Sequence, residues 1–229
     1  MERPNAMERP NVVKIYLDST DIETMRRLVD DPLIEGFTTN PSLLRKAGVT
    51  KYQHFAHRIL EIVKTKPVSF EVLSDDWAEM EKQAYEISTW GNNVWVKIPI
   101  TNTHGESSIP LIKRLQDLQL NITAVMTHQQ LEDLVNVAQA HHVISIFAGR
   151  INDADREAPI ISAWGLRANT LWASTRHTFS IKQAELYGYD IITMTPDLIA
   201  KLPLRGKDLA EYSLETVKQF HEDGKGITF

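Results

Sequence analysis

The segment Val94–Thr103, with the sequence VWVKIPITNT, combines a short apolar run with a single amine. The run follows Gly91–Asn93 and precedes Pro99, a pattern typical of a buried strand between two turns. Buried strands seldom contain lysine, so Lys97 is unusual here. Two interpretations fit this segment alone. Either the side chain reaches from the strand end to water, or it lies in a dry site. In a dry site the loss of solvent lowers the pKa of an amine and makes it a nucleophile for carbonyl groups.

Short apolar runs of this kind recur along the whole chain. They predict strands over Val13–Leu17, Leu33–Thr38, Val68–Leu73, Val94–Ile98, Asn121–Met126, Val143–Phe147, Asn169–Ala173 and Asp190–Met194. Amphipathic segments between them predict helices over Thr20–Val29, Tyr52–Val63, Trp77–Thr89, Ser108–Leu118, His128–Ala140, Ala158–Trp164 and Ile181–Tyr187. Asp75 or Asp76 can cap the helix at Trp77, and Thr127 the one at His128. Strands that alternate with helices, without a linker, predict an α/β protein with a single parallel (β/α)8 barrel.

The two ends of the chain lie outside this pattern. Residues 1–11 repeat the sequence MERPN, and we interpret them as a tag-like or disordered segment before a barrel domain over residues 12–206. Residues 207–229 hold a further amphipathic helix, Lys207–Glu222. Such a terminal helix packs either on the outside of its own barrel or on a neighbouring subunit.

Composition excludes several classes of function. Lys and Arg number 25 against 30 Asp and Glu, a net charge of −5 that does not suggest nucleic-acid binding. The chain has no cysteine, which excludes disulfides, cysteine catalysis and thiolate metal sites. It has neither an 18-residue apolar stretch nor an apolar signal core, so we expect a cytoplasmic protein without a membrane partner. No histidine spacing predicts a metal site, and no glycine-rich phosphate loop predicts a nucleotide cofactor.

Polar side chains occupy seven consecutive predicted strands, mostly at the carboxyl ends that form the active face of such a barrel. One or two would be ordinary turn chemistry, and Asp18 or Asn40 alone is more often a cap. Seven strands in a row indicate a site instead. The polar set comprises Asp18, Thr38, Thr39, Asn40, Glu71, Lys97, Asn121, Thr123, Ser145, Arg150, Ser174 and Arg176.

The residue types in this set suit imine chemistry. An inward amine such as Lys97 is the usual requirement for a Schiff base with a ketone, and carboxylates such as Asp18 and Glu71 can move its protons. Arg150 and Arg176 come near strands six and seven, where barrels commonly hold a phosphate. A surface ion pair is the alternative role for either arginine.

Taken in order, seven segments of the chain resemble the transaldolase family, which includes the short transaldolases and the fructose-6-phosphate aldolases. The segments are YLDST (Tyr16–Thr20), FTTNPSLL (Phe37–Leu44), SFEV (Ser69–Val72), VKIPIT (Val96–Thr101), NITAV (Asn121–Val125), ISIFAGR (Ile144–Arg150) and WASTR (Trp172–Arg176). They run in register from the first strand to the seventh, so the resemblance covers almost the whole chain.

The resemblance implies a role for each matching residue. Lys97 corresponds to the Schiff-base lysine, Asp18 to the acid/base that handles the substrate's hydroxyl proton, and Glu71 with Thr123 to the pair that positions a water. The residues matching those that hold the dihydroxyacetone unit are Thr38, Asn40, Asn121 and Ser145. Phe147 matches an aromatic lining the site, and the residues matching a phosphate-binding set are Arg150, Ser174 and Arg176.

Glu71 and Phe147 separate two branches of the family, because the aldolases tend to have glutamine and tyrosine there. The resemblance therefore implies a cofactor-independent transaldolase that moves a dihydroxyacetone unit from a ketose 6-phosphate, or a 6-sulfo-ketose, to an aldehyde such as glyceraldehyde 3-phosphate. Two alternatives stay open: an aldolase that releases free dihydroxyacetone, and a non-catalytic sugar-phosphate binding protein. The resemblance also implies a homo-oligomer, a pentamer or decamer.

The chain departs from the family pattern around the mouth of the predicted site. Ile146 stands where proline is usual, and Ala148 where valine is usual. The interval from Arg150 to Ser174 is short, and the loop Asn102–Ser108 is long and polar. These differences bear on the identity of the acceptor and leave the imine residues intact.

Overall fold

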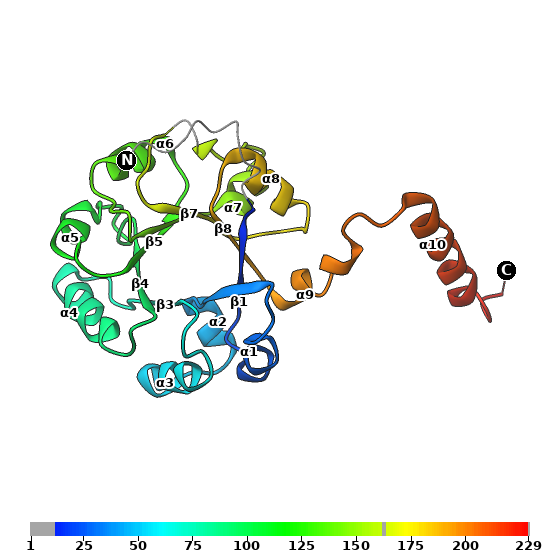
Figure 1. The fold of residues 1–229 in the computed structure, drawn as a ribbon, viewed down its shortest axis with the longest axis horizontal. Coiled ribbons are helices and arrows are strands. Elements are labelled where there is room, and N and C mark those ends of the chain that lie inside the picture. The colour runs from blue at the N-terminus through cyan, green and yellow to red at the C-terminus, as the bar shows by residue number, and fades with distance from the viewer. Residues whose placement is uncertain (1–11, 162–163, 229) are drawn as a thin grey trace.

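Eight parallel strands close into one barrel in the computed structural model, which describes residues 12–161 and 164–228 (Figure 1). Each strand pairs with the next along the chain, and the eighth returns to the first. The predicted (β/α)8 class is confirmed. The strands are β1 Lys14–Asp18, β2 Ile34–Thr38, β3 Val68–Glu71, β4 Val94–Pro99, β5 Leu120–Val125, β6 Val143–Ile146, β7 Asn169–Trp172 and β8 Ile191–Met194.

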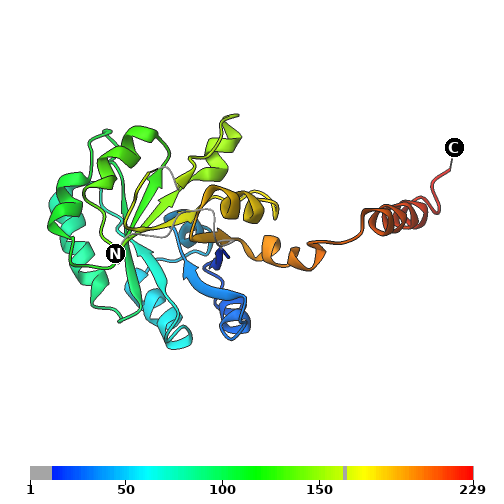
Figure 2. The same ribbon diagram turned by 45° about the horizontal axis from the view of Figure 1, so that its top comes forward.

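Helices surround the barrel (Figures 1 and 2). Their buried apolar residues join those of the strands in one core. They are α1 Ile22–Leu28, α2 Pro41–Lys46, α3 Tyr52–Ile62, α4 Trp77–Ser88, α5 Ile109–Arg114, α6 His128–Val135, α7 Ala148–Asp153, α8 Ser180–Tyr187 and α9 Pro196–Ile199. A 3-10 turn, Leu202–Leu204, then leads to α10, Leu209–Asp223.

Capping residues fix where several helices begin. Asp76, rather than Asp75, caps α4 and accepts a hydrogen bond from the backbone N–H of Glu79 at 2.9 Å. Thr127 caps α6 as predicted and forms a capping box with Gln130. Helix α2 was not predicted, because its six residues are too few for a periodic pattern. Pro41 in its first turn and Asn40 as its cap are the local signals for it.

The helix predicted over Ala158–Trp164 is wrong in its described part. Residues 158–160 have no regular structure, and residues 162–163 lie outside the described residues. Seven residues are too short a pattern to separate a helix from an irregular segment, and the buried Ala158 and Ile161 pack on the core from such a segment. The helix after β6 is instead α7, which starts at Ala148.

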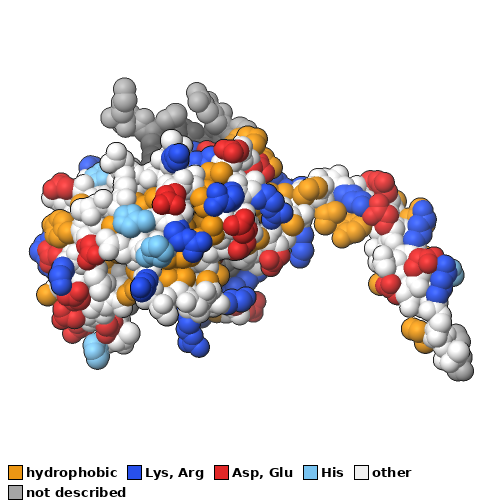
Figure 3. Space-filling model, turned by 90° about the horizontal axis from the view of Figure 1, so that it is seen from below, with side chains coloured by type: hydrophobic (Ala, Val, Ile, Leu, Met, Phe, Trp, Pro, Cys, Tyr) orange, Lys and Arg blue, Asp and Glu red, His pale blue; other side chains and the backbone are white. Residues whose placement is uncertain are grey.

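Helix α10 stands apart from the barrel at the end of an extended linker (Figures 1 and 2). None of its residues is buried. Figure 3 shows apolar side chains along this projecting segment, and the most exposed of them are Leu209 at 79%, Phe220 at 70% and Val217 at 60%. The segment 1–11, interpreted above as tag-like or disordered, lies outside the described residues. Across the described ranges, every helix is too short or too polar to cross a bilayer.

Candidate active site

Two rows of polar residues face the inside of the barrel near the carboxyl ends of its strands. In one row Glu71 pairs in register with Lys97, and Lys97 with Asn121, across β3, β4 and β5. In the other, Asp18 pairs with Thr38, and Thr38 with Ser69, across β1, β2 and β3. In-register residues of parallel strands point to the same face of the sheet. The register alone therefore brings these six residues together.

Lys97 lies inside the barrel and is 6% exposed. Its Nζ atom is 3.0 Å from Glu71 Oε2 and donates a hydrogen bond of 2.9 Å to the backbone carbonyl of Thr39. Of the two interpretations of the VWVKIP segment, the structure supports the dry site, because the amine turns inward to a carboxylate and a carbonyl. An amine held by two acceptors in a protected site is well placed for attack on a carbonyl group.

Asp18 ends β1 beside this amine and is half-buried. The hydroxyl of Thr38 donates to its Oδ1 at 2.9 Å, and the amide of Asn40 lies 3.4 Å from the same oxygen. Burial raises the pKa of Asp18, and the nearby Glu71 carboxylate adds to this; the Lys97 ammonium and the two hydrogen bonds oppose it. A carboxyl with a raised pKa can take up and return a proton more readily than an ordinary aspartate, as an acid/base requires.

A second group of hydrogen bonds fixes the far wall of the site. The amide of Asn121 donates to Ser69 Oγ at 3.0 Å, and the hydroxyl of Ser145 donates to Asn121 Oδ1 at 2.6 Å. Because Asn121 is held from both sides, its side chain has a defined orientation. Opposite it, the hydroxyls of Thr38 and Thr193 are 2.6 Å apart, so Thr193 can extend the chain of hydrogen bonds that ends at Asp18.

Thr123 occupies an irregular part of β5. The pairing of β5 with β6 shifts register after Ile122, and Ala124 has a φ of 63°, which few residues other than glycine adopt. Thr123 is 2% exposed, and its hydroxyl makes no hydrogen bond to any described residue. Buried hydroxyls are normally paired, so this one is available to a substrate or a water.

Close backbone contact brings the predicted anion-binding residues to one edge of the barrel. The N–H of Gly149 donates to the carbonyl of Ala173 at 3.2 Å, and a Cβ at Gly149 would lie only 1.7 Å from the carbonyl oxygen of Ser174. Only glycine fits there, which explains the glycine before Arg150. Ser174 itself has a φ of 61°.

The two arginines at this edge are differently placed. Arg150 is exposed, and its guanidinium lies 5.3 Å from the centre of the Phe147 ring. Arg176 lies in the loop after β7 and donates from Nε to both carboxylate oxygens of Asp153, at 3.2 and 3.0 Å. This pairing lowers the pKa of Asp153. The anion-binding role of Arg150, Ser174 and Arg176 stays a prediction.

The sequence of the chain matches the model of a known family. The model of the family described as "Transaldolase/Fructose-6-phosphate aldolase" matches residues 15–228, which include every strand end described above except the start of β1. The chain belongs to the transaldolase/fructose-6-phosphate aldolase family.

Several relatives in this family are similar over most of their length. A probable transaldolase of Petrotoga mobilis is 32% identical over 83% of this chain and 87% of its own. One from Mesorhizobium japonicum is 31% identical over 90% of this chain and 97% of its own. One from Thermoplasma acidophilum is 29% identical over 94% of this chain and its whole length.

Solved structures outside the family share the fold. A putative lyase/mutase from Burkholderia cenocepacia has a TM-score of 0.56 at 13% identity and covers 96% of this chain and 85% of its own. A 2,3-dimethylmalate lyase of the PEP mutase/isocitrate lyase superfamily has a TM-score of 0.55 at 14% identity, over 97% and 89%. At such identities the likeness shows the barrel fold alone.

Sequence reasoning missed three residues that contact the predicted set of this family member, Ser69, Thr193 and Asp153, and it missed the role of the Thr39 backbone carbonyl. Ser69 lies two residues before Glu71, so strand alternation could have placed it on the same face. Thr193 is a polar residue in the otherwise apolar β8, which was a usable signal. The role of the Thr39 backbone carbonyl and the pairing of Asp153 with Arg176 depend on tertiary structure, so no local pattern indicates them.

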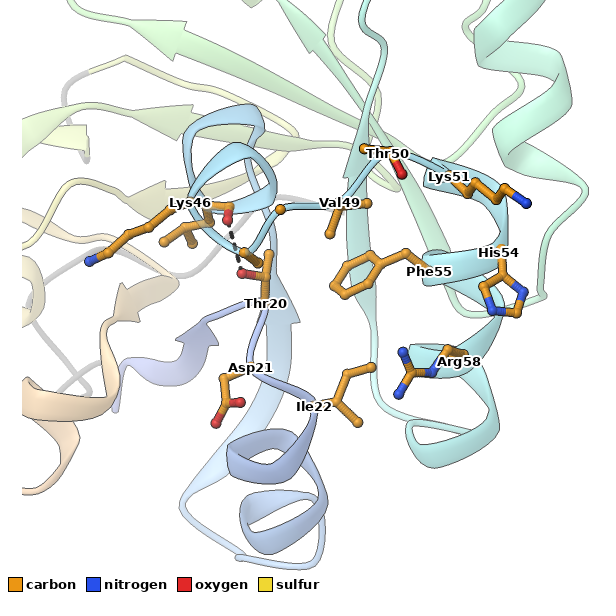
Figure 4. Close-up of a pocket in the computed structure, with 13 residues that line it drawn as sticks. Thr20, Asp21, Ile22, Lys46, Val49, Thr50, Lys51, His54, Phe55 and Arg58 are labelled. Carbon is orange, nitrogen blue, oxygen red and sulfur yellow. Dashed lines mark hydrogen bonds between the residues drawn. The ribbon is translucent and has the colours of Figure 1, made fainter.

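A groove lies outside the barrel and apart from the predicted residues. It lies between α1, the end of α2 and the start of α3 (Figure 4), where Phe55 lies between Val49 and Ile22 and Arg58 stands at the edge. None of the predicted site residues lines this groove. Within residues 12–161 and 164–228, no three His, Asp or Glu side chains gather as metal ligands would.

Proposed function

We propose that this protein is a transaldolase that uses Lys97 to form a Schiff base with a ketose. It would transfer a dihydroxyacetone unit from a ketose 6-phosphate, or from a similar anionic ketose such as a 6-sulfo-ketose, to an aldehyde such as glyceraldehyde 3-phosphate. No cofactor is required. The observation that carries the proposal is the Lys97 amine, held inside the barrel between the Glu71 carboxylate and the Thr39 carbonyl.

The proposed first half-reaction cleaves a carbon–carbon bond. The amine of Lys97 attacks the ketose carbonyl carbon, and the carbonyl oxygen leaves as water with two of the three protons of the Lys97 ammonium group. The nitrogen keeps the third proton, so a protonated imine forms. Asp18 then takes the proton of the hydroxyl two carbons from the imine carbon. As that oxygen becomes an aldehyde, the bond between the carbon bearing it and its neighbour breaks, and the electron pair moves into the imine to give an enamine. The raised pKa of Asp18 suits it to this step.

The second half-reaction reverses these steps on a different aldehyde. The enamine carbon attacks the acceptor carbonyl, Asp18 returns its proton to the new alkoxide, and water releases the product from Lys97. Glu71 contacts the amine directly, and the unpaired hydroxyl of Thr123 is available to hold that water. Asn121 and Ser145, which are locked together, would hold the hydroxyls of the three-carbon unit.

The net charge of the proposed anion-binding edge affects which anionic group, phosphate or sulfonate, the donor carries. Arg150 and Arg176 together supply two positive charges, and Asp153 offsets one of them. A sulfonate carries one negative charge, whereas a phosphate monoester carries about 1.5 to 2 at pH 7. The balance at this edge therefore suits a sulfonate at least as well as a phosphate. Replacing Asp153 with Asn should favour phosphorylated over sulfonated donors.

We also propose that α10 packs on the barrel of a second copy. A single 15-residue helix is marginal in water, and this one leaves large apolar residues exposed. The groove of Figure 4, with partly exposed Ile22 and Val49, offers an apolar surface of the required kind. Light scattering should find an oligomer that dissociates when Val217 and Phe220 are both replaced by Ser, and a concentration-independent monomer of the natural chain would contradict this assembly.

The function is tested with a panel of phosphorylated and sulfonated ketoses, each assayed with and without glyceraldehyde 3-phosphate. A transaldolase should turn over only when an acceptor aldehyde is present. Turnover without an acceptor, with release of dihydroxyacetone, would identify an aldolase instead. Binding without turnover of any donor would identify a sugar-phosphate binding protein, and the Lys97→Ala variant serves as the inactive control.

A further inference from the structure

Tyr52, the first residue of α3, reaches the strand ends that hold the Lys97 amine. Its ring packs edge-to-face with Trp90 and Phe70, at centroid distances of 5.3 and 6.2 Å. Its hydroxyl accepts a hydrogen bond of 2.8 Å from the backbone N–H of Glu71. A tyrosine outside the barrel thus contacts the backbone of Glu71, whose carboxylate pairs with Lys97.

The β2–β3 ladder shows what this contact replaces. The N–H of Phe37 donates to the carbonyl of Pro67, and the N–H of Thr39 donates to the carbonyl of Ser69. In a parallel ladder of this register, the next bond would run from the N–H of Glu71 to the carbonyl of Thr39. In the described residues that bond is not made. Tyr52 takes the Glu71 N–H instead, and the Thr39 carbonyl accepts from Lys97 Nζ.

We propose that Tyr52 is a positioning residue for the Schiff-base lysine: its hydroxyl ends the β2–β3 ladder one bond early and thereby frees the Thr39 carbonyl to hold the Lys97 amine. The inference rests on the proposed function. Buried backbone groups are almost always paired, so without this hydroxyl the Glu71 N–H has the Thr39 carbonyl as its natural partner. The amine would then share or lose one of its two acceptors.

Tyr52 is suited to this role because it is fixed and stays protonated. Burial raises its pKa, so the hydroxyl keeps its proton for one hydrogen bond and presents a lone pair to the Glu71 N–H. The aromatic contacts with Phe70 and Trp90 hold the ring in place. Removal of the hydroxyl alone, in Tyr52→Phe, keeps those contacts.

The test measures the rate of imine formation in a single turnover. The reaction is quenched with borohydride at successive times, and the reduced adduct is quantified by mass spectrometry. Tyr52→Phe should slow imine formation about 10- to 100-fold, the effect expected when a reacting group is displaced by a fraction of an ångström. The affinity of inorganic phosphate, which probes the anion-binding edge, should stay unchanged. Tyr85→Phe on α4 is the matched control, because Tyr85 is 49% exposed and lies outside the site.

A double-mutant cycle with Glu71→Gln separates positioning from general packing. If Tyr52 acts through the same amine as Glu71, the two slowdowns should be non-additive. Additive slowdowns, or a Tyr52→Phe rate equal to that of Tyr85→Phe, would overturn the proposal. If Tyr52→Phe does not fold, a variant with 3-fluorotyrosine at position 52 replaces it, because the oxygen of 3-fluorotyrosine is a weaker acceptor. Slower imine formation in this variant supports the role of Tyr52, and an unchanged rate overturns it. A natural chain that forms no adduct would contradict the proposed function itself.

Discussion

The predicted site has two halves that differ in burial and in the elements that carry them. The imine half consists of Lys97, Glu71 and Asp18, on strand positions in register, with the Lys97 and Glu71 side chains 7% and 16% exposed. The tail half consists of Arg150, Ser174 and Arg176, on the start of α7 and the loop after β7, and the Arg176 side chain is 47% exposed. The sheet fixes the groups proposed to react, whereas the groups proposed to bind the substrate's anionic tail lie on segments that vary more easily.

Electrostatics differ between the halves in the same way. In the imine half burial dominates and raises the pKa of Asp18. In the tail half the charges are in water, and the pairing with Arg176 lowers the pKa of Asp153. A substitution in the imine half should therefore act on the chemical step, and one in the tail half on substrate affinity.

The largest effect is expected from Lys97→Met, which keeps the length of the side chain and removes the amine. Without a nucleophile the imine route is closed, and kcat should fall by at least about 10,000-fold. The variant should keep its Tm within a few degrees, because the thioether suits a buried position. Retention of more than a hundredth of the natural kcat would show that the chemistry lies elsewhere.

The next largest effect is expected from Asp18→Asn, which keeps the shape and removes the proton acceptor. Imine formation should continue, while cleavage slows by about 100- to 10,000-fold. Rapid-quench analysis with borohydride should therefore find an accumulated donor adduct. Cleavage at the natural rate would show that Asp18 is not the acid/base, and it would remove Asp18 from the imine half.

Arg150→Ala should act on binding and leave the chemistry alone. Loss of a charge-assisted hydrogen bond of about 1.5 to 3 kcal/mol should raise KM for an anionic donor about 10- to 100-fold, with kcat changed less than threefold. Arg114→Ala is the control, since Arg114 is an exposed arginine on α5 that pairs with Glu81. An equal effect in both variants would make the tail half an ordinary charged surface.

The sequence predicts which residues belong to each half of the site, but it does not predict all the contacts between them. The strands carry strong local patterns, so the barrel followed from their order, and the gathering of Asp18, Glu71 and Lys97 at one face followed from their positions near the strand ends. The contacts of Lys97 with the Thr39 carbonyl and of Arg176 with Asp153 join segments far apart in the chain, which no local pattern encodes. The helix expected over Ala158–Trp164 failed because its apolar spacing covers only seven residues, and an irregular segment that packs on the core can show the same spacing.

The smallest effect concerns a group outside both halves. His142 precedes β6 at the opposite end of the barrel, is fully buried, accepts from the N–H of Gln139 and lies 3.1 Å from the carbonyl of Gln116. Burial lowers its pKa from 6.5 to about 4. The folded state therefore favours neutral His142, and its contribution to stability is present above pH 6.5 and lost as the pH falls toward 4.

We expect this loss to reach about 2 kcal/mol near pH 4. Urea titrations between pH 7 and 4 measure it, and His142→Asn, whose side-chain oxygen can still accept from Gln139, should show a flatter pH dependence. If both proteins lost stability equally, the acid sensitivity would have another source. The comparison also separates acid loss of activity at Asp18 from acid loss of the fold.

The central claim, that the imine half centres on Lys97, is tested most directly by mapping the borohydride-reduced adduct of the natural chain after incubation with a ketose donor. We predict one adduct of the three-carbon unit, on the peptide that contains Lys97, and no adduct in Lys97→Met. An adduct on a different lysine, or none with any donor that the protein turns over, would contradict the account.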